Sequence, residues 1–252
     1  MSFGEILDTA LRLLRDRFAT LTVIKTLSAV PLALIAAMRA GGVARFGGTR
    51  AVIAFLVIPI TSAIATRIAA GTFLGKSAGV REGVRTALAM ALPPVCTTLL
   101  GNLLVLAPIS VTVLLALRTH SLVAPVLALL AVVPTVYAWV GLLLVEQVIV
   151  LERRFGLAAL RRSWTLVRGN RARVVGAMAV AWLVGFAGAL LSRLVPDAIP
   201  VIGPVMGGLA GAIGAAYAVA VAALLYFDIR CRNEAFDLQH LADLVAAQAA
   251  PI

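Results

Sequence analysis

The sequence is short of charged residues, of cysteine and of histidine. Only 13% of its 252 residues are Asp, Glu, Lys or Arg, whereas 62% are hydrophobic and the mean hydropathy is +1.05. A water-soluble fold of this size could not bury so much apolar surface, and disordered chains have the opposite composition. Two cysteines, Cys96 and Cys231, allow at most one disulfide bridge, which excludes a disulfide-stapled secreted domain. The composition therefore indicates a multi-pass membrane protein.

Recognisable motifs of catalysis are also missing. The two histidines, His120 and His240, have no second ligand at metal-binding spacing, and no phosphate-binding loop, zinc motif or nucleophile elbow occurs. We therefore expect no enzyme activity, no catalytic residue, no bound metal and no cofactor.

Long apolar runs dominate the chain. A bilayer core of ~30 Å needs about 20 apolar residues per helix. Six runs reach that length, and they cover residues 19–38, 51–74, 86–117, 122–151, 174–194 and 199–229. The sequence thus predicts one all-α integral membrane domain over 1–252, a six-span helical bundle with an interfacial helix at 1–17 and a tail at 230–252.

The basic residues are distributed unequally between the connections. The net charge is +11, but the arginines lie between long apolar runs, which argues against nucleic-acid binding. Fifteen Lys and Arg residues lie before the first run and after the second, fourth and sixth, whereas five lie in the other connections. The positive-inside rule then places both termini in the cytoplasm of a cell with a bacterial-type plasma (inner) membrane.

Three of the basic segments are also amphipathic, at 2–17, 76–85 and 153–173. In the last of these, Leu157, Leu160, Trp164 and Val167 form an apolar stripe at helical spacing. Such helices lie in the membrane interface with their arginines near lipid phosphates. Each segment precedes two apolar runs, so the sequence also predicts a threefold repeat of elbow plus hairpin.

The last apolar run carries small residues every fourth position, at Gly203, Gly207, Gly211 and Ala215. Small residues let helices approach closely in lipid, so this stripe predicts the tightest helix crossing. An alternative is that the glycines line a pathway or form a hinge.

Three charged residues, Lys25, Arg67 and Glu146, fall inside apolar runs. Charges are costly in hydrocarbon and mark either structural ion pairs and snorkelling side chains or a site for a substrate or coupling ion. Prolines at several positions could break the helices, and broken helices favour the second interpretation.

The end of the last run is rich in charges at helical spacing. Asp228 with Arg232, and Arg230 with Glu234, are two pairs four residues apart. Asp228 and Asp237 could hold Arg161 and Arg162 in a structural clamp, or the arginines could bind lipid phosphate. The candidates for clamp or headgroup binding are Arg161, Arg162, Trp164, Arg168, Asp228, Arg230, Arg232, Glu234 and Asp237.

Two stretches carry a family resemblance. Residues 160–170 read LRRSWTLVRGN, and residues 224–230 and 234–238 read LLYFDIR and EAFDL. Together with the opening SFGEILD at 2–8, they resemble the membrane domain associated with glycerophosphoryl diester phosphodiesterases. The resemblance implies the membrane part of that family without its soluble hydrolase domain.

These observations favour a non-catalytic membrane module that acts as an accessory in lipid or envelope processes. Its partners would be anionic lipid headgroups and a further membrane protein. The alternative is a small transporter that uses Lys25, Arg67 and Glu146, and a lipid-active enzyme is the third hypothesis. The sequence does not indicate an oligomeric state.

Overall fold

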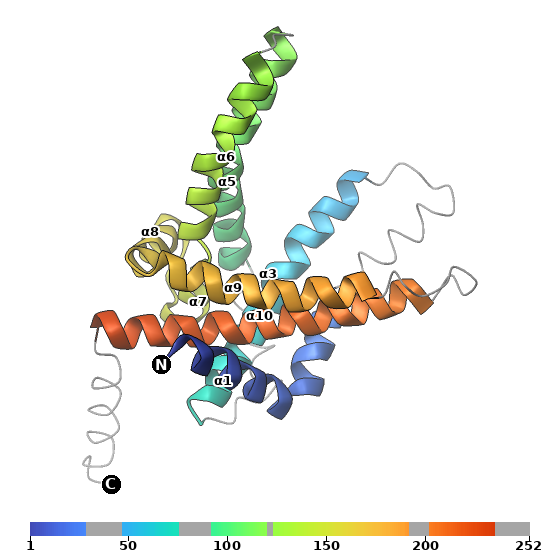
Figure 1. The fold of residues 1–252 in the computed structure, drawn as a ribbon, viewed down its shortest axis with the longest axis vertical. Coiled ribbons are helices and arrows are strands. Elements are labelled where there is room, and N and C mark those ends of the chain that lie inside the picture. The colour runs from blue at the N-terminus through green and yellow to red at the C-terminus, as the bar shows by residue number, and fades with distance from the viewer. Residues whose placement is uncertain (29–46, 76–91, 120–122, 192–201, 235–252) are drawn as a thin grey trace.

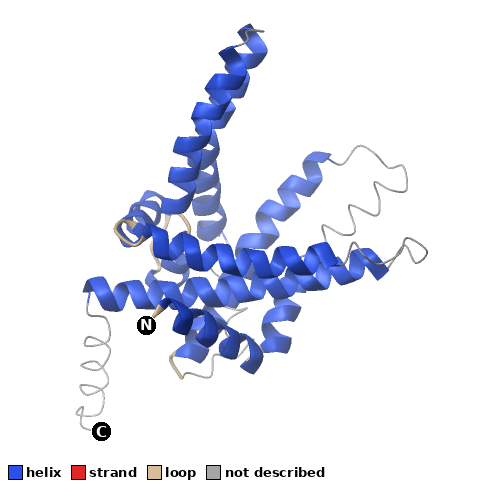
Figure 2. Ribbon diagram, viewed as in Figure 1, coloured by secondary structure: helices blue, strands red, loops and turns tan. Residues whose placement is uncertain are grey.

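The computed structural model describes residues 1–28, 47–75, 92–119, 123–191 and 202–234, and these consist of helices joined by short turns (Figures 1 and 2). No strand occurs within these ranges. The helices are α1 (Phe3–Asp16), an unlabelled helix (Phe18–Ser28), α3 (Gly47–Phe73), α5 (Leu92–Thr119), α6 (Val123–Gly141), α7 (Val145–Gln147), the π-helix η1 (Val148–Glu152), α8 (Gly156–Val167), α9 (Arg171–Leu191) and α10 (Ile202–Glu234).

Five stretches of helix are long and apolar enough to cross a membrane: Leu56–Phe73, Pro93–Leu115, Leu129–Glu152, Arg171–Gly188 and Met206–Glu234. They correspond to the second to sixth predicted runs. Within the first run, the structure describes only the short apolar helix Phe18–Ser28. Residues 29–38, the elbow at 76–85 and the tail from 235, with Asp237, lie outside the described residues. A sixth span and a threefold repeat therefore stay predictions.

The long helices diverge from a common end (Figure 1). The hairpin α5–α6 points away from the hairpin α9–α10, and α3 runs between these directions. The N-terminus, α7, α8 and the last turns of α10 lie together at the end that we name the basal end. Large apolar side chains on the diverging helices are exposed, such as Leu103, Val133 and Phe186. A lipid bilayer would cover these surfaces.

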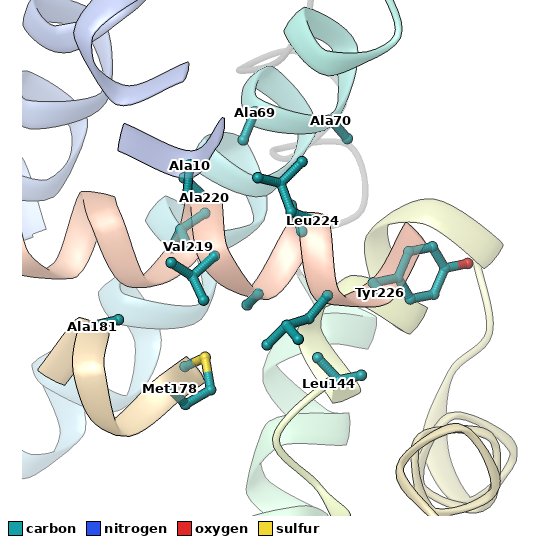
Figure 3. Close-up of a cluster of buried hydrophobic side chains, with 14 of the residues drawn as sticks. Ala10, Ala69, Ala70, Leu144, Met178, Ala181, Val219, Ala220, Leu224 and Tyr226 are labelled. Carbon is teal, nitrogen blue, oxygen red and sulfur yellow. The ribbon is translucent and has the colours of Figure 1, made fainter. Parts of the chain in front are cut away.

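The core lies around the second half of α10 (Figure 3). Leu224 and Tyr226 are fully buried, and Val219 and Ala220 are nearly or fully buried. Their neighbours in the cluster come from four other elements and include Ala10 in α1, Ala69 and Ala70 in α3, Leu144 before α7, and Met178 and Ala181 in α9. Because α10 is apolar on all sides here, it serves as the central helix of the fold.

The amphipathic helices α1 and α8 pack their apolar faces on protein. A capping box of Ser2 and Glu5 begins α1, whose Ile6 and Ala10 are fully buried while Asp8 and Arg12 form an exposed ion pair. In α8, Leu160 and Val167 of the predicted stripe are buried, whereas Leu157 is exposed. Only part of each predicted interfacial surface is therefore free to meet lipid.

Helices α9 and α10 cross through small residues, although not through the predicted stripe. A Cβ atom at Gly214 would overlap the backbone of Gly185, and one at Gly188 would lie 2.8 Å from the Cβ of Ala210. Nothing lies within 4 Å of a Cβ built at Gly211. Gly207 and Ala215 are half-buried, and the surroundings of Gly203 are outside the description. The tightest crossing of α9 and α10 is thus at Ala210 and Gly214, whereas Gly211 and Ala215 of the predicted stripe line a cavity.

Candidate functional site: an intramembrane cavity above a charged cluster

A cavity of about 460 Å³ lies where α3, α7, α9 and α10 meet the helix Phe18–Ser28. Most of its wall is apolar and includes Ile58, Leu143, Met178, Trp182 and Val219. Four polar side chains also line it, and they are Lys25, Ser62, Glu146 and Gln147. The three helices α3, α9 and α10 are candidate membrane spans, so this polar group lies between segments that would be surrounded by lipid.

The structure brings Lys25 and Glu146 together. Lys25 is only 6% exposed, and its Nζ donates a hydrogen bond to Ser62 Oγ at 2.6 Å. Glu146 lines the same cavity wall as Lys25 and Ser62, and its negative charge attracts the Lys25 ammonium. Arg67, the third charge predicted inside the membrane, is half-buried elsewhere on α3 and does not line this cavity.

Gln147 adds an unsatisfied acceptor to the same wall. Its side chain is 2% exposed, and its Oε1 has no hydrogen-bond partner among the described residues. A buried polar atom without a partner is destabilising by about 1–3 kcal/mol, so such atoms are rare away from functional sites. Sequence reasoning missed Gln147, although two adjacent polar residues in the run 122–151 were a signal for it.

A break in the helix places Glu146 and Gln147 on the cavity wall. Helix α6 continues through Pro134 and ends at Gly141, and a turn over residues 142–144 leads into α7 and the π-helix η1. A Cβ atom at Gly141 would overlap the indole of Trp164, and Ser163 Oγ donates to the Gly141 carbonyl at 2.9 Å. Packing of α8 against this turn therefore fixes the break. Discontinuous helices and π-helical turns of this kind recur at binding sites in membrane proteins.

A second cavity of about 200 Å³ lies on the other side of the broken segment, against α5 and α6. Its wall includes the polar side chains of Thr98 and Asn102. Glu146 and Leu143 line both cavities. Trp139 of the small cavity stacks on Trp182 of the large one, with ring centroids 4.9 Å apart. The broken segment thus separates two chambers, and one carboxylate faces both.

A charged cluster lies below the large cavity, at the basal end. Glu152 accepts hydrogen bonds from Arg162 Nε and from the Tyr226 hydroxyl, each at 2.9 Å, and forms an ion pair with Arg154. Arg162 also donates to Glu234 at 2.8 Å. The same Glu234 accepts from Arg230, which in turn donates to the Tyr226 hydroxyl.

The electrostatics of this cluster favour the charged form of its central arginine. The hydrogen bond to Glu234 raises the pKa of the Arg162 guanidinium above its ordinary value, and the hydrogen bond to Glu152 acts in the same direction against the smaller effect of burial. Arg162 therefore stays charged and ties η1, α8 and α10 together.

A second group of charges surrounds Asp228, whose side chain is 2% exposed. Its carboxylate accepts from the Met1 amino group at 2.8 Å and from Arg232 Nε at 3.0 Å, and Arg173 Nε lies 3.1 Å away. Nearby, the Arg171 guanidinium lies 4.1 Å from the ring centre of Tyr137 and 5.3 Å from that of Trp164. The contacts of Asp228 join the N-terminus and the first turn of α9 to the end of α10, and those of Arg171 join α9 to α6 and α8.

The predicted pairs Asp228–Arg232 and Arg230–Glu234 are confirmed. The predicted clamp needs a correction, because the acids that hold Arg162 are Glu152 and Glu234 rather than Asp228. Asp228 is already surrounded by Met1, Arg173 and Arg232. Arg161 in α8 and Arg168, which directly follows α8, are exposed.

Glu152 was missed in the sequence, although it is an acid placed directly before Arg153 and Arg154. No group of three His, Cys, Asp or Glu side chains converges on a metal-sized space within the described part of the chain. Cys96 and Cys231 are free thiols. Comparisons with protein-family models, with curated proteins and with solved structures each gave no match.

Proposed function

We propose that the protein is a small carrier that binds a polar solute in the large cavity and moves it across the membrane. The observation behind this proposal is the wall of a cavity of about 460 Å³, where half-buried Glu146 joins buried Lys25 and buried Gln147, whose Oε1 has no hydrogen-bond partner among the described residues. Ionisable groups at membrane depth are costly and are retained mainly for pathways and binding sites. The volume also falls in the range of ~300–1,000 Å³ that is typical of ligand sites.

A purely structural ion pair explains these residues less well. A buried ion pair stabilises a protein only when its remaining hydrogen-bonding capacity is satisfied, and it is often no better than apolar packing. Here an acceptor remains without a partner, and the space beside it is open. Packing is also relaxed at this point, because a Cβ atom built at Gly211 would meet no atom of another described segment within 4 Å.

The charged cluster suits the role of a closed gate under the cavity. On α10, Val219 and Ala222 line the cavity, whereas Tyr226 and Arg230, one and two turns further on, belong to the cluster. Leu224 and Leu225 are fully buried between the two sites. We propose that the basal end faces the cytoplasm, where opening would require the contacts of Arg162 with Glu152 and Glu234 to separate.

Four residues of the stretches that resemble the phosphodiesterase-associated membrane domain belong to this gate. Arg162, Tyr226, Arg230 and Glu234 belong to the resembling stretches, and all four take part in the cluster. We propose that these motifs serve closure of the basal end. The proposal assigns no residue to catalysis.

Flux into proteoliposomes tests the carrier proposal. We propose a panel of labelled leucine, lysine, succinate, phosphate and sorbitol, which covers zwitterionic, cationic, anionic and uncharged solutes. Saturable uptake of at least one probe should occur with the wild-type protein and be lost in E146Q. The R67Q variant is the matched control and should retain uptake, since Arg67 does not line the cavity. Uptake equal to that of protein-free liposomes for every probe would contradict the proposal.

A second candidate function is binding of anionic lipid through α8. Arg153, Arg154, Arg161 and Arg168 are exposed and lie near the exposed apolar side chains of Phe155 and Leu157. This combination is typical of a helix in the membrane interface. The double variant R161E/R168E should then lower the affinity for anionic lipid in nanodiscs without lowering stability, because Arg162 keeps its internal partners. Unchanged lipid binding would remove this candidate.

A further inference from the structure

The large cavity presents one positive and one negative group and is neutral overall. Among the described residues of its wall, Lys25 and Glu146 are the ionisable side chains. Taking a charge into a medium of low dielectric constant is unfavourable unless an opposite charge compensates it. Since Lys25 and Glu146 already compensate each other, a ligand with a net charge would leave one charge in excess. The cavity therefore selects against net-charged ligands.

The same groups retain hydrogen-bonding capacity of both kinds. The Lys25 ammonium has three donors, of which the hydrogen bond to Ser62 uses one. The Glu146 carboxylate, which lines the same wall, offers about four acceptor sites. Gln147 Oε1 receives no hydrogen bond from the part of the chain that the structure describes. A ligand that satisfies this wall must bring acceptors to Lys25 and donors to Glu146 and Gln147.

The rest of the wall is shaped for an apolar group. Ile58, Met178, Trp182 and Val219 surround the polar residues with hydrocarbon and an aromatic ring. At ~30 Å³ per water molecule, about 460 Å³ equals the volume of roughly 15 waters. This is room for a molecule of amino-acid size, or for a lipid headgroup whose chains remain outside.

Building on the proposed carrier function, we infer that the cavity takes a zwitterion with an apolar body. The anionic group of the ligand lies at Lys25, and its ammonium group lies between Glu146 and Gln147 Oε1. Two sources supply this chemistry, namely a free amino acid with an apolar side chain and a zwitterionic lipid headgroup.

Binding to the full chain in nanodiscs tests the inference, with probes that share one apolar body. The soluble probes are leucine as the zwitterion, 4-methylpentanoate as the anion and 3-methylbutylamine as the cation. The lipid probes are short-chain phosphatidylethanolamine, which is zwitterionic, and phosphatidylglycerol, which is anionic. In calorimetry, at least one zwitterion should bind about tenfold or more tightly than its net-charged analogues. Leucine alone identifies a soluble ligand, and phosphatidylethanolamine alone identifies a lipid.

Single neutralising variants give a readout that loss of stability cannot mimic. K25M leaves the charge of Glu146 in excess, so preference should shift from leucine to 3-methylbutylamine. E146Q leaves the charge of Lys25 in excess, so preference should shift to 4-methylpentanoate. A variant that does not fold would bind none of the probes. In that case the paired variant K25E/E146K provides the test, because it keeps the cavity neutral and should retain the preference for zwitterions.

The outcomes separate this inference from the carrier proposal. If the wild-type protein prefers a net-charged or an uncharged probe, the inference of a zwitterionic ligand is wrong. Flux of lysine, succinate or sorbitol would in that case still support the carrier proposal. If none of the probes binds, the inference of a zwitterionic ligand is also wrong. Absence of flux with zwitterion binding intact would overturn the carrier alone.

Discussion

At the residue scale, the pair Lys25 and Glu146 makes the most direct prediction. Removing one charge leaves the other buried without compensation, whereas removing both leaves a neutral cavity. K25M and E146Q should each lower the free energy of unfolding by about 3 kcal/mol, and K25M/E146Q should recover most of that loss. Denaturation in detergent followed by circular dichroism measures this cycle. Strictly additive losses would show that the two side chains do not interact.

The functional prediction for the same pair is different. The double variant K25M/E146Q should regain stability but not solute uptake, because both groups that hold the ligand are gone. Full uptake by a stable double variant would show that the pair is only structural.

Arg162 makes a prediction about pH. A group whose pKa is raised on folding contributes stability that is complete below its unfolded pKa, which for arginine already lies far above neutral pH, and is lost only as the pH rises through the still higher folded value. R162M should therefore be less stable than the wild type by about 2 kcal/mol, and this difference should stay constant from pH 7 to pH 10. Thermal unfolding at both pH values measures it. A difference that has halved by pH 10 would contradict the assignment.

At the scale of helices, the corrected crossing of α9 and α10 can be tested with matched alanine variants. G214A introduces a methyl group where the backbone of Gly185 already lies, so it should destabilise the protein by about 2 kcal/mol. G211A places the same methyl group in open space and should be tolerated. Thermal unfolding compares the two variants. An equal loss of stability in both would favour the predicted stripe as the site of the crossing.

This pair of glycines also shows which features of the fold can be predicted from the sequence. Hydropathy located five of the long helices within a few residues, because length and apolar content alone decide whether a segment can span a bilayer. The same sequence contains small residues four apart at Gly207 and Gly211 and also at Ala210 and Gly214. Spacing within one helix cannot decide which of these faces meets α9, because that depends on the partner's own glycines.

The break between α6 and α7 could not be predicted from the sequence, for a related reason. Apolar residues continue without interruption from Leu142 to Val145, so hydropathy predicts one continuous span. Prolines were the expected breakers, yet α6 passes through Pro134. The break follows from contact of Gly141 with Trp164, 23 positions later in the chain. Long-range packing therefore placed Gln147 on the cavity wall and Glu152 in the charged cluster, whereas the local pairs on α10 were predictable from spacing alone.

At the scale of the whole molecule, the basal end collects the N-terminus, the connection from η1 to α9 and the end of α10. The distribution of arginines predicts that this end faces the cytoplasm. In a C96S/C231S background, an impermeant thiol reagent should label A172C, an exposed position between Arg171 and Arg173, in inside-out vesicles and not in intact cells. Labelling in intact cells would invert the orientation.

The cavity itself provides the measurement closest to the central claim. Ala215 lines the cavity, whereas Leu183 is exposed on α9 at a similar level, since Gly185 contacts Gly214. In the same cysteine-free background, a small impermeant thiol reagent should label A215C from outside and also, in inside-out vesicles, from the cytoplasmic side, while L183C in lipid stays unlabelled. Labelling of A215C from neither side, or from one side only, would contradict a solute pathway through this cavity.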